Sequence, residues 1–501
     1  MIAKDNLSLN TVEKDGFQRF MKIIAPLYKI PARKQITKLL DEKYEVLSLL
    51  MKKKIATATT ITLTCDVWTE VLNTVSFLGI TAHFLFQGEL TSVSIGIYEL
   101  DERHTAKYLG TVLDNICMDW NIPLSKIHAV VTDNAANIVK AVEIVFGKNK
   151  HVACLAHSIN LIPAKIFDKL PDLKVLINKI KSIVTYFKHS VLASDELRKN
   201  QRASGTSLKL IQEVSTRWSS TYYMIERFME VIDNVSAVLI NQRNSPPMLS
   251  AFEVATAQEI LKILKPLEMI TVEISNEKHP TISKVIPMIY LLRNKINELT
   301  PESEIGKQSK KYILQEINVR FNNIENNELY AIATVLDLRF RKIYFESQLS
   351  CSNAIHKINK LLQNTKNEQQ NINNKTNLHT EVDPTSLWSS HSSLVAKANN
   401  LISENGSGCL HSHLKNYLNQ DALPLQANPI EYWTSIENAC PNLSKIALKY
   451  VSTIATSVPS ERLFSRTGNI MTDNRNRLKG DRLSRLLFLS SLDIADWHLS
   501  D

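Results

Sequence analysis

Three consecutive segments near the start of the chain carry the residue alternation of β-strands, and this pattern constrains the fold more than any other. In ITLTCDVWTE, the apolar residues Ile61, Leu63 and Cys65 alternate with polar ones, as in a strand with one buried face. The strand-like runs NTVSFLGITAHFLF and ELTSVSIGIYEL follow, joined by a turn-like Gln-Gly-Glu tripeptide. Short turns connect antiparallel strands, so these segments predict a three-stranded antiparallel meander.

The next part of the chain alternates helical and strand-like patterns. Apolar residues recur at helical spacing in HTAKYLGTVLDNICMDW and again in NAANIVKAVEIVFG. Between these two runs, IHAVVTD is a short apolar run that ends in Asp133 and predicts a buried parallel strand; HVACLAH is a second strand candidate. A long helical pattern from about Ser158 to His189 follows. The order of elements predicts an α/β fold, in which a mixed sheet has helices on its faces.

Helical patterns dominate the remainder of the chain. Residues from about Thr216 to Phe345 form amphipathic patterns, and the block from about Pro429 to the end is helical again. The stretch His356 to Glu381, rich in Asn, Lys and Gln, predicts a flexible excursion rather than packed structure. We therefore expect a helical segment over residues 1–55, a sheet-containing core over 56–215, an all-α insertion over 216–428 with a flexible loop near 356–385, and a C-terminal part over 429–501.

The composition indicates a soluble, intracellular globular protein. The apolar fraction is 44% and the charged fraction 22%, and no stretch reaches the roughly 18 consecutive apolar residues that a membrane span requires. The N-terminus has no apolar secretory segment. The six cysteines are scattered without a CxxC pair, as expected of reduced thiols. A net charge of +9 slightly favours polyanionic partners.

Two aspartates stand where a metal site could form. Metal-dependent cleavage of phosphodiesters needs several carboxylates, because hard divalent cations take oxygen ligands. Asp66 lies on the polar side of the first strand and Asp133 at the end of the next parallel strand, so adjacent strands would bring both to one edge of the sheet. The alternative, simpler on spacing alone, is that Asp66 is a solvated strand residue and Asp133 caps the following helix.

Five short strings occur in order along the chain and together resemble one family. They are CDVWT at 65–69, TDNAAN at 132–137, CLAH at 154–157, STRWSS at 215–220 and PSERLFSRTGNI at 459–470. This set resembles the hAT superfamily of DNA transposases, especially the branch whose members begin with a BED-type zinc finger. The N-terminal FMKIIAPLYKIPARKQIT resembles the segment that follows that finger. The similarity runs from about Gly16 to Leu489.

The resemblance implies a ribonuclease-H-like sheet core interrupted by a large all-α insertion. The three acidic positions of the family fall on Asp66, Asp133 and Glu461, which would be both the catalytic and the metal-binding residues. They would hold Mg²⁺ or Mn²⁺, as two ions, for hydrolysis of a DNA strand and joining of the ends by transesterification. The alternative for Glu461 is a residue that complements the helix dipole in the first turn after Pro459.

The same resemblance implies residues that contact DNA, namely His157, Arg217 and Trp218. His157 matches a residue that lines the active centre, where it could contact a phosphate; the alternative is that it caps a helix. Trp218 matches a tryptophan that stacks on a base at the cut end. Its helical spacing with Tyr222 and Ile225 equally predicts core packing.

We expect no zinc site in this chain. Cys154 and His157 supply only two of the four ligands that structural zinc takes. Cys409, His411 and His413 lie at alternate positions on an expected loop, which is poor ligand geometry. The BED finger of the family would lie before residue 1, so the usual reader of transposon ends is expected to be missing. A truncated gene model, a decayed element and retention by a host are all compatible with this expectation.

The C-terminal block resembles the dimerisation region of the family. Its apolar residues exceed what one helix normally buries; they are Leu463, Phe464, Ile470, Leu478, Leu483, Leu486, Leu487 and Leu489. Interleaved basic residues would either neutralise phosphates or form a solvated face; they are Arg462, Arg466, Arg475, Arg477, Lys479, Arg482 and Arg485. We expect a homodimer or higher homo-oligomer formed through this region.

Two functions of different classes follow from these patterns. The first is a transposase core that cleaves and transfers DNA strands with metal ions. The second is a domesticated, catalytically silent dimer that associates with DNA and regulates transcription. An inactive relic is a third interpretation. We expect a nuclear protein with DNA as partner, no membrane association and no small-molecule substrate.

Overall fold

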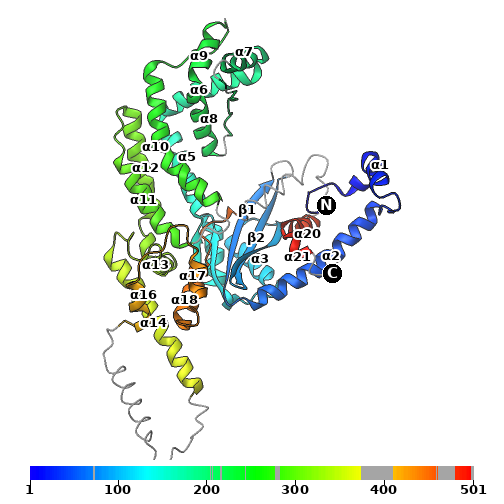
Figure 1. The fold of residues 1–501 in the computed structure, drawn as a ribbon, viewed down its shortest axis with the longest axis vertical. Helices are drawn as coiled ribbons and strands as arrows, with labels where there is room; N and C mark the ends of the chain where they lie inside the picture. The colour runs from blue at the N-terminus through cyan, green and yellow to red at the C-terminus, as the bar shows by residue number, and fades with distance from the viewer. Residues whose placement is uncertain are drawn as a thin grey trace, which may run out of the picture. The chain divides into compact units, whose positions relative to one another are not determined.

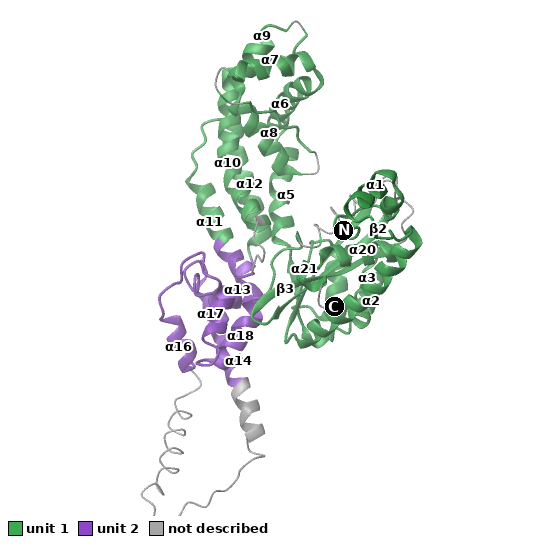
Figure 2. Ribbon diagram, turned by 45° about the vertical axis from the view of Figure 1, so that its right-hand side comes forward, with its two compact units in different colours: residues 1–281, 288–322, 453–501 green, residues 282–287, 323–452 purple. Residues whose placement is uncertain are grey.

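The computed structural model describes all residues except 71–73, 203, 204, 206, 215, 216, 243, 277–281, 374–409, 459, 461–479 and 498–501. The chain forms two compact units, coloured separately in Figure 2. The first unit comprises residues 1–281, 288–322 and 453–501, and the second comprises residues 282–287 and 323–452. Among the described helices, none combines the length and the apolar character of a membrane span.

The first unit contains a five-stranded mixed sheet (Figure 1). Its strands are β1 (Ile61–Glu70), β2 (Val75–Phe86), β3 (Glu89–Leu100), β4 (Ile127–Thr132) and β5 (His151–Ala153). They lie in the order β3-β2-β1-β4-β5. The first three strands are antiparallel neighbours, whereas β4 is parallel to β1 and β5 is parallel to β4. This arrangement confirms the predicted meander, the two predicted parallel strands and the mixed α/β class.

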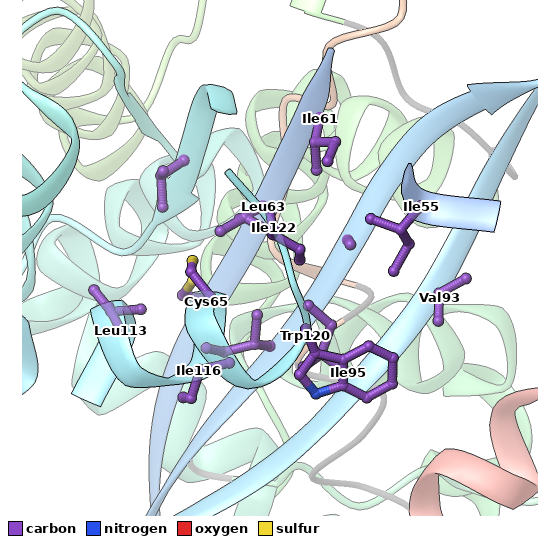
Figure 3. Close-up of a cluster of buried hydrophobic side chains, with 14 of the residues drawn as sticks. Ile55, Ile61, Leu63, Cys65, Val93, Ile95, Leu113, Ile116, Trp120 and Ile122 are labelled. Carbon is purple, nitrogen blue, oxygen red and sulfur yellow. The ribbon is translucent and has the colours of Figure 1, made fainter. Parts of the chain in front are cut away.

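One face of the sheet carries the main apolar core, for which the alternation in β1 is responsible. Ile61, Leu63 and Cys65 are at most 1% exposed and belong to one cluster with side chains of α2 (Arg33–Thr57), α3 (Ala106–Asp119) and α4 (Ala136–Phe146). Figure 3 shows part of this cluster, including Leu113 and Trp120. Burial raises the pKa of the Cys65 thiol, so this cysteine behaves as a small apolar residue.

The opposite face of the sheet is polar although it is equally buried. Thr64 on β1 pairs with Thr81 on β2, which pairs with Ser94 on β3, and all three are at most 5% exposed. In the next row Thr62 pairs with His83, whose ring bonds to Thr64 Oγ1 at 3.1 Å and to Ser92 Oγ at 2.8 Å. Asp66 shares this face, because alternate strand residues point the same way.

The C-terminal helix α20 (Gly480–Ser491) covers the edge strand β3, and α21 (Ile494–Trp497) follows it. At the contact, Gly96 has φ +140°, next to a register shift between β2 and β3, and Ser484 Oγ accepts a 3.2 Å hydrogen bond from Ile97 N–H. An uncovered edge would leave such N–H groups unpaired. The helix α20 therefore covers this edge of the sheet.

The described part of the C-terminal block does not present the apolar and basic surface that its composition suggested. Leu483, Leu487 and Leu489 are fully buried within the first unit. Arg482 pairs with Asp41 at 3.1 Å, and Arg485 Nη1 lies 3.5 Å from Asp41 and 3.3 Å from Glu45. The predicted residues Leu463, Phe464, Ile470, Leu478, Arg462, Arg466, Arg475, Arg477 and Lys479 lie outside the described part.

The first unit also contains helices that come before, between and after the strands in the sequence. The N-terminal elements are η1 (Leu9–Glu13) and α1 (Asp15–Ile24), and η2 (Leu124–Lys126) precedes β4. After β5 come α5 (Leu155–Lys169), α6 (Pro171–His189), α7 (Val191–Arg202), α8 (Trp218–Glu230), α9 (Ile232–Ile240), α10 (Ala251–Asn276) and α12 (Glu304–Phe321). The long helix pattern predicted up to His189 is two helices, because Pro171 starts a new one at its first position.

The second unit is helical within the described residues. It contains η3 (Ile282–Lys284), η4 (Ile324–Asn326), α13 (Glu328–Val335), α14 (Gln348–Asn373), α16 (Ser412–Leu418), α17 (Pro429–Ser435) and α18 (Pro441–Val451). The helix α11 (Val285–Glu298) begins in this unit and continues in the first. Its core includes a fully buried Asp337, which pairs with Arg339 at 2.6 Å and accepts from Ser283 at 2.7 Å.

The flexible excursion predicted near residues 356–385 was wrong for its first part. The helix α14 continues to Asn373, and its residues Ile358 and Leu362 are fully buried. These two apolar side chains are four residues apart, so they lie on one buried face of the helix. The many polar residues around them led to the prediction of a flexible segment. Residues 374–385 lie outside the described part of the chain.

Candidate functional site

Asp66 and Asp133 lie just beyond the same end of the pairing between the parallel strands β1 and β4. In the pairing of β1 with β4, Thr64 is opposite Val131. Asp66 follows Thr64 by two residues and Asp133 follows Val131 by two residues, so the two aspartates continue one register. Neighbouring strands lie about 4.8 Å apart. Both aspartates are only half-buried, which leaves them accessible to a ligand.

Local contacts orient each of the two carboxylates. Asp66 lies within β1, opposite Gly79 on β2, and its Oδ1 accepts a 3.0 Å hydrogen bond from Val67 N–H. Asp133 follows the last residue of β4, and its Oδ1 accepts from Ala135 N–H at 3.2 Å. The N-cap of α4 is Ala135. The alternative interpretation of Asp133 as the helix cap is therefore wrong, because the cap lies two residues later and the helix begins at Ala136.

The segment that leads to Glu461 is anchored on β1. Ser460 is fully buried, and its hydroxyl lies 3.0 Å from both Thr64 Oγ1 and the backbone carbonyl oxygen of Thr64. Thr64 precedes Asp66 by two residues on the same face. Glu461 itself lies outside the described residues.

A second set of contacts ties the same segment to the start of α5. The backbone N–H of Leu155 donates to the carbonyl of Ala455 at 3.0 Å, and the N–H of Ser457 donates to Cys154 Sγ at 3.2 Å. Cys154 is the N-cap of α5, and its sulfur also accepts from His157 N–H at 3.4 Å. Cys154 is 1% exposed, so this residue has a structural role.

His157 lies in the first turn of α5 and is half-buried. Cys154 holds the cap position, so His157 does not cap this helix as the alternative had it. Within the described part of the chain, no group of three or more His, Cys, Asp or Glu residues could hold a metal ion.

Trp218 is packed in the helical layer, whereas Arg217 is exposed. Trp218 is the first residue of α8 and is 7% exposed, and its indole N–H donates to Asn160 Oδ1 on α5 at 2.9 Å. Tyr222 and Ile225 of the same helix are buried as well, as the helical spacing predicted. The contact of either residue with DNA stays a prediction.

Sequence reasoning missed His151, the first residue of β5. Its Nε2 lies 2.9 Å from Thr132 Oγ1, and that hydroxyl donates to the backbone carbonyl of Asp133 at 2.6 Å. Burial lowers the pKa of His151, while the backbone of Asp133 and the negative charges of Asp133 and Glu143 raise it. Only its place beside the CLAH string could have pointed to it.

His411 of the second unit makes a structural contact. His411 is the N-cap of α16, and its Nδ1 accepts from His413 N–H at 3.3 Å. Cys409 lies outside the described part. The ring of His411 is thus engaged in capping a helix.

Two family models match parts of the chain. Residues 152–263 match the "ZBED1 RNase-like helical domain" and residues 413–492 match the "hAT family C-terminal dimerisation region". The first match begins in β5 and covers the helices up to the middle of α10. The second match covers α20, whose apolar side chains are buried in the first unit.

Relatives that match nearly the whole of this chain carry the names of transposases, of BED-finger proteins and of a transcriptional regulator. Zinc finger BED domain-containing protein 4 of Homo sapiens is 24% identical over 98% of this chain and 42% of its own length. A Zea mays protein assigned as an AC transposase is 25% identical over 95% of this chain and 62% of its own length. A Talaromyces stipitatus protein assigned as the transcriptional regulator tpeD is 23% identical, over 97% and 60% respectively.

The chain therefore spans less than two thirds of the length of each of these three relatives. The two family matches and the relatives agree with the order of the five strings along the sequence. This chain is a hAT-family transposase-like protein.

Proposed function

We propose that this protein cleaves and transfers DNA strands with divalent metal ions, using Asp66, Asp133 and Glu461. The observation that carries this proposal is the anchoring of Ser460 on Thr64. It ties the residue before Glu461 to β1, two residues from Asp66, although the two positions are 396 residues apart in sequence. Adjacent strands bring Asp133 to the same edge.

The sheet supports a ribonuclease-H-like core. Its order β3-β2-β1-β4-β5 combines a three-stranded antiparallel meander with two parallel strands. In a mixed sheet of this kind, the carboxyl ends of adjacent parallel strands share one edge. Asp66 and Asp133 occupy that edge, where loops and an inserted segment can reach them.

The two aspartates fit hard divalent cations. They are half-exposed carboxylates in one register, and Asp133 Oδ2 accepts no hydrogen bond from the described residues. Carboxylate oxygens are the ligands that Mg²⁺ and Mn²⁺ prefer. Two bound ions would supply Lewis-acid stabilisation to the attacking and leaving oxygens of a phosphodiester. The protein's own part is to hold the carboxylates in place and to bind the DNA.

Duplex DNA is the substrate class that the charge of the chain supports. The formal net charge is +9, and Arg217 is exposed beside the start of α8. His157, half-buried at the start of α5, is a phosphate contact in this proposal. Trp218 is buried in the described geometry, so base stacking by its ring would require α8 to move. We place the protein in the nucleus, as a homodimer or higher homo-oligomer formed through the region over 413–492.

Cleavage of DNA by the purified chain tests the proposal. We expect nicking of a supercoiled plasmid with Mg²⁺ or Mn²⁺, and loss of at least about 10²-fold in rate for Asp66→Asn, Asp133→Asn and Glu461→Gln, since metal ligands dominate such sites. Asp119→Asn is the matched control, because Asp119 is exposed at the end of α3. Equal nicking by the wild type and all three site variants would reject the assignment.

A second function is favoured by one observation, the similarity to a fungal protein assigned as a transcriptional regulator. In this alternative the chain binds DNA as a dimer without cutting it. Light scattering would then give a dimer, and electrophoretic mobility shifts would be equal for the wild type and Asp133→Asn. No nicking would occur with any divalent metal. A monomer at micromolar concentration would count against it.

A further inference from the structure

The two aspartates of the proposed site are held by different kinds of contact. Asp66 lies inside β1, where the ladder with β2 fixes its backbone opposite Gly79. Asp133 lies just beyond β4, and the ladder between β4 and β5 ends at the pair Thr132 and Ala153. A residue outside the ladder needs other contacts to keep its orientation. Asp133 is therefore the carboxylate whose position depends on side chains.

His151 reaches the backbone of Asp133 through the hydroxyl of Thr132. A threonine hydroxyl has one proton, and in Thr132 it is donated to the Asp133 carbonyl at 2.6 Å. The 2.9 Å contact with His151 must then run from the imidazole Nε2–H to Thr132 Oγ1. The result is a chain of donors that starts on β5 and ends on the carbonyl of Asp133.

The environment favours a stable link. Thr132 is fully buried and His151 is half-buried, so solvent does not compete for the hydroxyl. Hydrogen bonds in such surroundings are costly to leave unmade. The Nε2 proton that the link requires is present both in one neutral tautomer and in the cation, so the link does not depend on whether the ring is charged.

We propose that His151 is the positioning residue of Asp133, and that it keeps this carboxylate aligned with Asp66 for a divalent cation. This inference rests on the proposed function. Contacts behind a metal ligand commonly set metal affinity by 10–100-fold, because they fix the orientation of the ligand. His151 does not itself need to touch metal or DNA.

Three variants separate the hydrogen bond from the bulk of the ring. His151→Phe removes the Nε2–H donor and keeps an aromatic ring. His151→Gln places an amide N–H near the position of Nε2 and should rescue the link. Thr132→Val removes the relaying hydroxyl and keeps the branched shape. The matched control is His189→Phe, which makes the same replacement at an exposed position in the same unit.

Two readouts are measured on the full chain. The first is Mn²⁺ binding by electron paramagnetic resonance, for which we expect His151→Phe to weaken affinity by about 10–100-fold. His151→Gln and His189→Phe should bind Mn²⁺ as the wild type does. Thr132→Val should weaken binding, and the double variant with His151→Phe should be no weaker than the worse single one, because both changes break the same link.

The second readout is amide hydrogen exchange of the peptide that contains residues 132–135. Faster exchange there in His151→Phe, restored in His151→Gln, supports the positioning role whether or not the protein cleaves DNA. If the wild type neither binds Mn²⁺ nor nicks DNA, the proposed function fails and exchange alone decides the link. Unchanged exchange and unchanged Mn²⁺ affinity in His151→Phe would overturn the inference, as would a His151→Gln variant that behaves like His151→Phe.

Discussion

The hydroxyl of Ser460 donates a 3.0 Å hydrogen bond to the backbone carbonyl of Thr64, across 396 residues of sequence. The same hydroxyl lies 3.0 Å from Thr64 Oγ1, and both residues are fully buried. The contact joins the segment after the helical insertion to β1, the first strand of the sheet. It determines which part of the C-terminal segment faces the polar side of the sheet.

Removing the Ser460 hydroxyl should lower the stability of the first unit. Ser460→Ala leaves the buried oxygen and hydroxyl of Thr64 with one partner fewer, which costs about 1–3 kcal/mol of unfolding free energy. Urea denaturation followed by circular dichroism measures the change. Ser182→Ala is the control, because its hydroxyl bonds to its own helix at an exposed position. Equal midpoints for Ser460→Ala and the wild type would show that the contact contributes nothing.

A methyl group at Gly96 should detach α20 from the edge of the sheet. A Cβ at this position would lie 2.3 Å from Ser484 Oγ, and the backbone φ of +140° already disfavours other residues. We expect Gly96→Ala to cost about 1–3 kcal/mol, through strain and lost contact. Gly147→Ala separates the two effects, because Gly147 has φ +102° with nothing within 4 Å of its Cβ position.

The discriminating result is the difference between these two glycine variants. Limited proteolysis should release the C-terminal segment faster from Gly96→Ala than from Gly147→Ala, since only the first disturbs α20. Equal protease resistance would mean that the helix adjusts to the methyl group. Ser484→Ala in the Gly96→Ala background removes the nearest atom and should restore part of the loss.

The strands could be predicted from the sequence, whereas the burial of their polar side could not. Ile61, Leu63 and Cys65 carry the period of β1 and all face the main core. Thr64, on the other side, is just as buried, because it is covered by His83 of the neighbouring strand and by Ser460, which is 396 residues away in sequence. Periodicity reports which face is apolar, and it does not report what covers the other face.

Charge and composition do not reveal ion-pair partners that lie on another helix. For Arg482 and Arg485 the sequence left open phosphate contacts or a solvated face, and neither alternative included the carboxylates of α2 with which they pair. His151 carried no signal beyond its place beside the CLAH string, because its role depends on the register of β5 beside β4, which one sequence does not specify. The order of the aspartates along the chain was readable, whereas the contacts that orient them were not.

Trp218 should matter more for stability than for DNA contact in the described geometry. Its ring is 7% exposed and hydrogen-bonded to Asn160, so Trp218→Ala should cost about 3–5 kcal/mol through the cavity it leaves. Chemical denaturation gives this value. Tyr28→Ala removes an aromatic ring that is 57% exposed and should change little. A Trp218→Ala variant with wild-type stability and lost DNA affinity would reverse this assignment.

Glu316 should make the helical layer sensitive to acid. Its side chain is 4% exposed, and burial raises its pKa, but Lys165 and Lys169 at 3.2 Å outweigh that effect and lower the pKa overall. A carboxyl whose pKa is lowered by folding stabilises the protein above its unfolded pKa. That stabilisation is lost as the pH falls through the folded pKa.

Comparison of Glu316→Gln with the wild type at several pH values tests this. The difference in unfolding free energy should be about 2 kcal/mol at pH 7 and should shrink in acid, where the wild type also carries a neutral group. Glu298→Gln, at a surface pair in which Glu298 is 66% exposed, should show a small difference at every pH. A difference for Glu316→Gln that is independent of pH would exclude the charge as its origin.

The hydrogen bonds between Thr64 and Ser460 can form only late in the synthesis of the chain. The five strands leave the ribosome first, and the residues that complete their polar side and cover the β3 edge follow only after the long helical insertion. At the 5–20 residues per second typical of translation, this interval lasts on the order of tens of seconds. For that time the β3 edge of the nascent sheet is uncovered, and its unpaired backbone groups are open to pairing with other strands until α20 is synthesised.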